Sequence, residues 1–183
     1  SVDERLDEVL ERVKEDMDRN RRKNDESLRE DEENVRRNKK ETDESVKRVE
    51  ERVRELKKRV KDERVKEFLD RVLEEIRKSA EEVKTIIDEV HKESEETVRR
   101  TKKIIEEVLR RIEELIRRVK KDRKEEVVKT RDHMVLHEYV NAAGITDEAH
   151  KRNKELNERV NRVNKEAHKR NEDLLREAER KVR

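Results

Sequence analysis

The sequence predicts an all-α fold: an antiparallel three-helix bundle of coiled-coil-like helices, each about 60 residues long. Charged residues make up 57% of the chain and apolar residues 28%, with one Gly and no Pro, a composition typical of long helices. The apolar residues recur at steps of three and four, a pattern that argues against a disordered chain. This pattern changes phase twice, so the 183 residues are expected to form one domain of three helices.

The first predicted helix has a seam, the line of residues facing the other helices, that advances by three or four residues at every step as far as Val60. Its phase then slips, and it slips again after Val119. Both slips lie in similar strings, RVKDER around Asp62 and RVKKDR around Asp122. We interpret them as tight reversals, with a continuous helical rod as the rival interpretation. The reversals make consecutive helices antiparallel and place them at about 2–61, 63–121 and 123–183.

The second predicted helix, about 63–121, has a wider apolar stripe than its neighbours. Apolar residues occur there as adjacent pairs, among them Phe68/Leu69, Ile86/Ile87 and Ile104/Ile105. A helix with one narrow seam does not need such a stripe. This helix is therefore either the central one of the three or one wall of a groove for a fourth helix.

All three predicted helices carry polar seam residues near mid-length, whereas the seams toward their ends are apolar. In an antiparallel bundle these polar stretches come to about the same level. Asn in a coiled-coil seam specifies register and oligomeric state, and a buried amide requires hydrogen-bond partners. We therefore predict a polar core network of Asn20, Asn24, Asn34, Asn38, His91, Asn153, Asn157, Asn164, His168 and Asn171.

Three seam histidines, His91, His150 and His168, allow a second interpretation, a pH switch. Imidazoles titrate between about pH 5 and 8, and protonation inside a buried network would open the bundle. The sequence has 5 His residues. Because Asn outnumbers His in the predicted network, helix specificity is the favoured role.

The sequence contains no recognisable catalytic constellation, so we expect no enzyme, no cofactor and no metal site. There is no Cys for thiol chemistry, and a single Gly cannot form a phosphate-binding loop. His133 and His137 would share a helix face, but HMVLH lacks the Glu of HExxH and a third ligand.

The charge balance, 53 Lys plus Arg against 51 Asp plus Glu, gives nucleic-acid binding little support. No apolar run reaches the length of a membrane span. We expect a soluble protein without a membrane partner, suited to recombinant cytosolic expression.

Residues 131–146, inside the third predicted helix, break the pattern of the rest. They read RDHMVLHEYVNAAGIT and include the only Tyr and the only Gly of the chain. From Met134 to Val140 the residues alternate with a period of two, as in a strand with one buried face. Gly144 would cost a helix interior about 1 kcal/mol relative to Ala. Such a local conflict indicates a functional or a foreign element.

This string resembles the eleventh and last β-strand of green fluorescent protein, in the form used as a split-fluorescent-protein tag. The resemblance covers Arg131–Thr146, under a tenth of the chain, and the remainder resembles computationally designed (de novo) helical bundles. It implies a partner, the ten-stranded fragment of the barrel, to which the strand adds by β-augmentation before the chromophore matures.

The resemblance also implies roles for single residues of the strand. Glu138 would face the chromophore and take part in its proton network. The inward side of the strand would be formed by Met134, Leu136, Glu138 and Val140. The outward side would carry His137, Tyr139 and Asn141.

Two placements of the segment are open. In one, residues 123–183 form a single helix that holds the segment in helical form. In the other, the chain breaks near residues 143–146 and restarts with Asp147 as an N-cap. The equal helix lengths and the aligned polar stretches favour the first.

Bundle and segment together predict an engineered switch or biosensor in which the bundle cages the strand. A competing helix, a lower pH or the barrel fragment itself would release it. Caging by about 4 kcal/mol would weaken complementation roughly a thousandfold.

The alternative is a designed bundle or heterodimer module, monomeric or a designed oligomer, whose Asn/His hydrogen-bond networks set its pairing and whose strand is only a detection tag. A third interpretation is an open three-helix bundle that awaits a designed partner helix.

Overall fold

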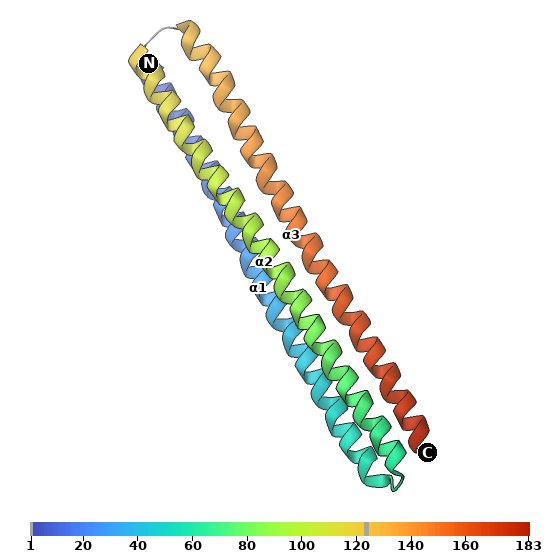
Figure 1. The fold of residues 1–183 in the computed structure, drawn as a ribbon. Helices are drawn as coiled ribbons and strands as arrows, with labels where there is room; N and C mark the ends of the chain where they lie inside the picture. Colours follow the sequence, from blue (N-terminus) through green and yellow to red (C-terminus); the bar gives the residue numbers. More distant parts are fainter. Residues whose placement is uncertain (1, 123–124) are drawn as a thin grey trace. The chain divides into compact units, whose positions relative to one another are not determined.

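The protein is all-α, with three long helices in a computed structural model that describes the backbone of residues 2–122 and 125–183 (Figure 1). Side chains are described for residues 3–121, 137 and 141–183. The helices are α1 (Val2–Arg59), α2 (Glu63–Asp122) and α3 (Glu125–Val182). The predicted fold class is confirmed, and the predicted helix ends agree with these bounds to within about two residues.

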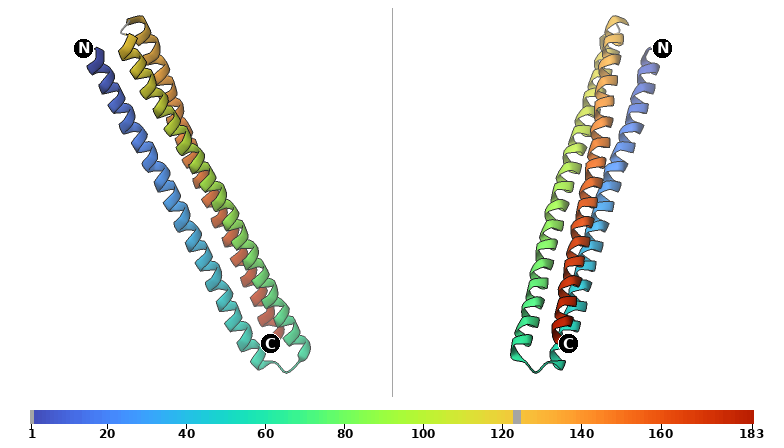
Figure 2. Two further views of the ribbon diagram at one scale, coloured as in Figure 1. Left: turned by 60° about the vertical axis from the view of Figure 1, so that its left-hand side comes forward. Right: turned by 90° about the vertical axis from the view of Figure 1, so that its right-hand side faces the viewer.

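The reversal between α1 and α2 uses neither Gly nor Pro and is completed within residues 60–62 (Figure 2). The Asp62 carboxylate accepts a hydrogen bond of 2.9 Å from the backbone N–H of Arg64. This contact makes Asp62 the N-cap of α2, because it satisfies one of the free N–H groups of the first turn. Three basic residues in the last turn of α1 complement the negative end of the α1 dipole: Lys57, Lys58 and Arg59.

The chain divides into two compact units, each of which contains a part of every helix. Unit 1 comprises Ser1–Glu30 with Ser94–Lys154, and unit 2 comprises Asp31–Glu93 with Glu155–Arg183.

Unit 1 contains an antiparallel pair of helices and a third helix parallel to the first. Residues early in α1 contact residues late in α2, since Lys120 pairs with Asp7 and Lys14 lies 3.7 Å from Glu113. Residues of α3 follow α1 in the same direction, since Lys23 lies 3.2 Å from Asp147 and, further along both helices, Ser27 contacts His150. The predicted antiparallel order of consecutive helices is therefore confirmed in this unit.

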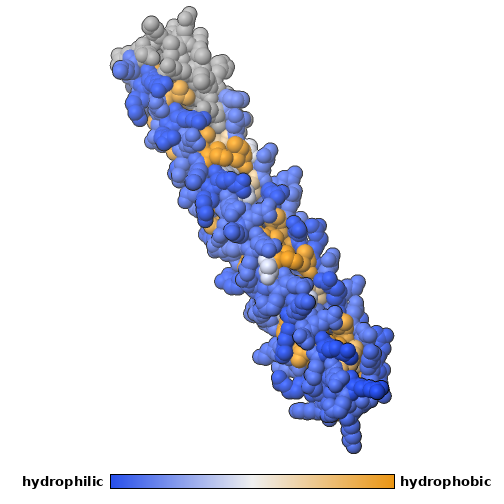
Figure 3. Space-filling view, viewed as in Figure 1, coloured by the Kyte–Doolittle hydropathy of each residue, from blue (hydrophilic) through white to orange (hydrophobic). Residues whose placement is uncertain are grey.

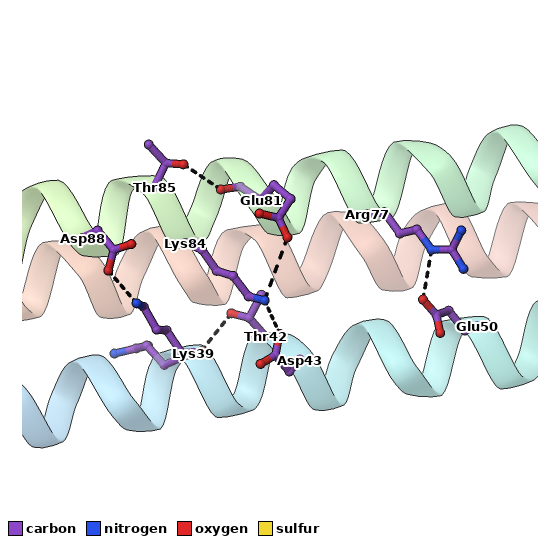
Figure 4. Close-up of polar contacts among 10 residues, drawn as sticks. Lys39, Thr42, Asp43, Glu50, Arg77, Glu81, Lys84, Thr85 and Asp88 are labelled. Atoms are coloured by element: carbon purple, nitrogen blue, oxygen red, sulfur yellow. Dashed lines mark hydrogen bonds and ion pairs between the residues drawn. The ribbon is translucent and has the colours of Figure 1, made fainter.

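Unit 2 has the same arrangement, and its α1–α2 contacts keep a constant register (Figure 4). The bridging ion pairs are Lys57–Asp70 at 2.6 Å, Arg77–Glu50 at 3.0 Å and Lys39–Asp88 at 2.6 Å. Helix α3 again runs parallel to α1, with contacts Asn38–Asn161 at 2.9 Å and Arg52–Glu179 at 2.9 Å.

Among the described residues, apolar side chains form one cluster in unit 1 and two in unit 2. The unit 1 cluster includes Met17, Ile105, Ile112 and Ala142. In unit 2, one cluster gathers Val53, Leu69, Ile76 and Ala178, and the other gathers Val83, Ile87, Val90 and Val160. Burial of these side chains is the main source of stability, since helices of this length gain most of theirs from tertiary packing.

The wide stripe of α2 packs against both neighbours. Ile104 and Leu115 lie partly buried against the unit 1 cluster, and Leu73 lies partly buried against a unit 2 cluster. Phe68 reaches α3, where the Lys181 ammonium lies 3.8 Å from its ring centroid. Among the described residues, the doubled apolar positions thus serve contacts within the three-helix units.

The predicted polar layer differs from the observed interior in one respect. Opposite Asn38 and Thr42 of α1, helix α2 presents the apolar Val83, Ile87 and Val90. The reason is register: the polar stretch of α2 begins only at His91, beyond these residues. In this part of unit 2 the hydrogen bonds of Asn38 and Thr42 to a second helix are therefore made to α3, while α1 and α2 are joined by ion pairs at the exposed edge.

The described surface is strongly polar. On the face viewed in Figure 3, hydrophilic residues dominate and hydrophobic ones show as small separate spots. None of the described helical stretches combines the length and the hydropathy needed to cross a bilayer.

Candidate functional site

The best-formed polar cluster lies between α1 and α3 of unit 2. The Asn164 amide donates to Asn38 Oδ1 at 2.7 Å, and Thr42 Oγ1 lies 2.9 Å from Asn164 Oδ1. Asn38 donates in turn to Asn161 Oδ1 at 2.9 Å and to the backbone carbonyl of Asn34 at 2.8 Å. Because Asn38, Thr42 and Asn164 are all buried, these bonds fix the register of α3 against α1.

A second contact joins α1 to α2 in the same unit. His91 Nδ1 lies 2.5 Å from Asp31 Oδ2, and the Asp31 side chain is 1% exposed. A buried carboxylate is costly unless it is paired, so His91 is its stabilising partner.

Unit 1 also contains a hydrogen bond to a histidine, in this case between α1 and α3. Ser27 Oγ and His150 Nδ1 form a hydrogen bond, and Ser27 is buried. The fully buried Thr146 donates to the backbone carbonyl of Ala142 at 3.0 Å. Both residues lie at predicted polar seam positions, although neither is among the residues named above for the polar core network.

Several residues predicted for the network have buried polar atoms without a hydrogen-bond partner. These atoms are Asn24 Nδ2, Asn34 Nδ2, Asn153 Nδ2 and Oδ1, Asn157 Oδ1 and His168 Nε2. Asn20 and Asn171 are buried as well. A buried polar atom left unpaired costs about 1–3 kcal/mol, so these positions lower the free energy of unfolding.

The polar positions repeat along the chain, a signal that the sequence analysis missed. The string EAHKRN occurs at 148–153 and again at 166–171, and DES occurs at 25–27 and again at 43–45. Each repeat follows after eighteen residues, as from His150 to His168. At 3.6 residues per turn this distance is five turns, so the repeated residues lie on the same helix face.

The strand-like segment 131–146 is helical, because α3 runs without interruption from Glu125 to Val182. The single-helix placement is thus confirmed, and no break occurs near residues 143–146. Ala142 and Thr146 are each 0% exposed, and Ala142 belongs to the apolar cluster of unit 1. Gly144 is exposed, with open space around an added Cβ.

The predicted inward residues of the strand lie outside the described side chains: Met134, Leu136, Glu138 and Val140. Of the predicted outward residues, His137 and Asn141 are exposed and lie 3.4 Å apart at Nε2 and Nδ2. His133, half of the weighed metal pair, also lies outside the described side chains. Within the part of the chain that the structure describes, no three His, Cys, Asp or Glu residues group as metal ligands.

Charged residues at the edges of unit 2 reinforce its helix contacts. A hydrogen bond to Glu179 on α3, followed by one to Glu55, raises the pKa of the Arg52 guanidinium. A hydrogen bond to Asp43 raises the pKa of Lys84, although desolvation opposes this shift. Both shifts show that the charged forms are favoured in the folded protein.

No protein-family model, curated protein or solved structure matches this chain.

Proposed function

We propose that this chain is an engineered helical bundle that holds a split-fluorescent-protein strand in helical form and so restrains its pairing with the ten-stranded barrel fragment. The observation that carries the proposal is the conformation of residues 131–146, which lie in uninterrupted α3. A segment with strand-like alternation inside a helix is a local conflict of the kind expected at a functional element.

Helical and strand conformations of the segment exclude each other. A strand that augments a sheet must offer its backbone N–H and C=O groups to a neighbour. In α3 these groups form hydrogen bonds along the helix. At the end of the segment, the side chains of Ala142 and Thr146 are also buried. The barrel fragment can therefore bind only after α3 has released the segment. The apparent affinity of the protein for the fragment equals the affinity of the released segment multiplied by the fraction of molecules in which it is released.

Complementation kinetics test this proposal directly. The protein is mixed with the ten-stranded fragment, and the rise in fluorescence is compared with that of a free peptide of residues 131–146. We expect the intact protein to respond more slowly. A response as fast as that of the free peptide contradicts caging and favours the alternative, a bundle in which the strand is only a detection tag.

A matched pair of variants outside the segment separates caging from a general effect of fusion. Ala149 is buried in unit 1 and Lys151 is exposed on the same helix. Ala149→Glu places a charge in the interior and is expected to accelerate complementation. Lys151→Glu is expected to leave the rate unchanged. Equal rates for both variants and the parent would contradict the proposal.

A further inference from the structure

One edge of unit 2 lacks the polar contacts that close the other two. Ion pairs join α1 to α2, and hydrogen bonds with one ion pair join α1 to α3. The third edge, called the α2–α3 edge, is formed by residues 63–90 and 155–183, all of which the structure describes. Between these two ranges no ion pair or hydrogen bond is formed, and Lys181 over the ring of Phe68 is the charged contact that joins them.

Apolar side chains line the α2–α3 edge at regular intervals. Ile86 follows Phe68 by eighteen residues and Val163 precedes Lys181 by eighteen, so each pair is separated by five helical turns. Because α2 and α3 run antiparallel, Ile86 and Val163 come to one level, about 27 Å from the contact of Lys181 with Phe68. Leu174 lies between the two levels.

The four residues of this apolar row are Phe68, Ile86, Val163 and Leu174, and none of them is fully buried. In the lower half of the view in Figure 3, hydrophobic spots follow the line between these two segments of α2 and α3. The apolar row is thus only partly covered by the three helices of unit 2.

Glutamates flank the apolar row on α2. Glu75, Glu82 and Glu89 recur every seven residues and form what we call the Glu row. All three are exposed, and none has an ion-pair partner among the described residues. The opposite flank of α2 differs, because its charged residues are paired with α1, as in Arg77–Glu50.

A helix is the partner that this arrangement fits. Charges repeated every seven residues are typical of the flanks of a coiled coil, where they select the partner helix. The flank on α3 carries both signs, with Arg159 and Arg170 beside Glu166 and Glu177, so it discriminates little. The Glu row therefore determines the charge of the partner, which must place basic residues along α2.

We propose that the α2–α3 edge of unit 2 is a docking surface for a helix of another chain. Its apolar seam covers the apolar row, and its lysines or arginines pair with the Glu row. All three helices of this chain already have places in unit 2, so the occupant is a fourth helix. The proposal is independent of caging, because residues 131–146 belong to unit 1.

Two synthetic helical peptides of about four heptads serve as probes. Both carry leucine and isoleucine along the seam and glutamine along one flank. The other flank carries lysine in the first peptide and glutamate in the second. Each peptide is labelled with a fluorophore and titrated with the full-length protein, and fluorescence anisotropy gives the Kd. We expect the lysine peptide to bind about tenfold more tightly. Equal affinities overturn the proposal.

A matched pair of double variants locates the surface. Glu75→Lys with Glu82→Lys reverses the Glu row and is expected to invert the preference between the two peptides. Glu67→Lys with Glu74→Lys changes the net charge equally but lies eight residues earlier, about 80° around the helix, and should keep the preference of the parent. All four positions are exposed. If the two double variants behave alike, the peptides do not bind at the α2–α3 edge.

Val163→Ser distinguishes addition of a fourth helix from replacement of α3. Val163 contributes to the apolar row from α3, so its loss should weaken binding of the lysine peptide severalfold if the peptide adds to the unit. If the peptide replaces α3, the same substitution weakens a competitor and tightens binding. Tighter binding therefore contradicts the proposal.

Light scattering of the protein alone tests a second copy as the occupant. We expect the parent and the variant Glu75→Lys with Glu82→Lys to have the same oligomeric state. A dimer formed by the parent and lost in this variant would show that the edge binds a second copy, and it would overturn the proposed partner.

Discussion

Asparagine has two opposite effects in this interior, depending on whether its amide finds a partner. Asn164 donates to Asn38 at 2.7 Å and lies 2.9 Å from the Thr42 hydroxyl. Asn153 is 2% exposed, and neither of its amide atoms has a partner. The net value of a buried polar group depends on such pairing, because its desolvation cost is the same in both cases.

Replacement of these two asparagines by leucine is expected to change stability in opposite directions. Asn164→Leu leaves Asn38 Oδ1 unpaired and should lower the free energy of unfolding by about 1–3 kcal/mol. Asn153→Leu removes two unpaired atoms and should raise it by about 1 kcal/mol. Urea denaturation followed by circular dichroism measures both. Equal destabilisation by the two variants would mean that water satisfies the Asn153 amide.

Lys84 carries a pH dependence at alkaline pH. Its hydrogen bond to Asp43 raises its pKa, so its contribution is complete below the unfolded pKa of about 10.4 and is lost as the pH rises through the folded value. Lys84→Met should therefore destabilise the protein by about 0.5 kcal/mol at pH 8 and by less above pH 11. Thermal unfolding at both pH values measures the change. A pH-independent difference would indicate packing by the lysine stem instead.

Helix α3 contains the weakest helix-forming position of the chain. Gly144 lies inside α3, exposed, and a Cβ built there meets no neighbouring atom within 4 Å. Its only effect on the helix is therefore the entropy of the glycine backbone.

Gly144→Ala is expected to stabilise α3 by about 0.5–1 kcal/mol. If α3 restrains the strand, complementation by the intact protein should also slow by roughly two- to fivefold. The same substitution in the free peptide 131–146 is the control, because it reports any effect on barrel pairing alone. A stabilised helix without slower complementation would show that the segment is released by another route.

The whole molecule consists of two units that share three helices, so release of α3 can be local or global. Ile105 lies in the unit 1 cluster with Ala142, and Ile76 lies in a unit 2 cluster with Ala178. Both isoleucines are 0% exposed. Substitution of each isoleucine by alanine is therefore the same chemical change made in a different unit.

Truncation of either isoleucine to alanine should cost about 2–5 kcal/mol. If release is local, Ile105→Ala accelerates complementation more than Ile76→Ala does, since it loosens the unit that holds the end of the segment. Stopped-flow mixing with the ten-stranded fragment gives both rates, and urea denaturation verifies that the two losses of stability are similar. Equal acceleration would contradict local release and show that the units open together.

Much of the fold was predictable from the sequence, because the features that define it are local. A period of 3.6 residues and two phase slips indicate three helices whatever their partners are. The eighteen-residue repeat is equally local, since the string EAHKRN occurs twice in the sequence.

Hydrogen-bond partners were not predictable, because they depend on register and rotamers across two helices. Asn164 and Asn153 occupy similar seam positions, yet only Asn164 finds partners on α1. The apolar face that α2 presents to Asn38 likewise follows from the register between helices. Sequence spacing places a residue on a face, whereas the facing helix decides what it meets.

The sequence by itself determined the helices, their order and the break in pattern at residues 131–146, since composition and period are properties of one chain segment. Only the tertiary structure decided that this segment is helical and continuous with α3. The physical reason is that a sixteen-residue string with strand-like alternation has no strong local preference for a helix. Tertiary burial of Ala142 and Thr146 supplies that preference by packing the end of the segment into unit 1.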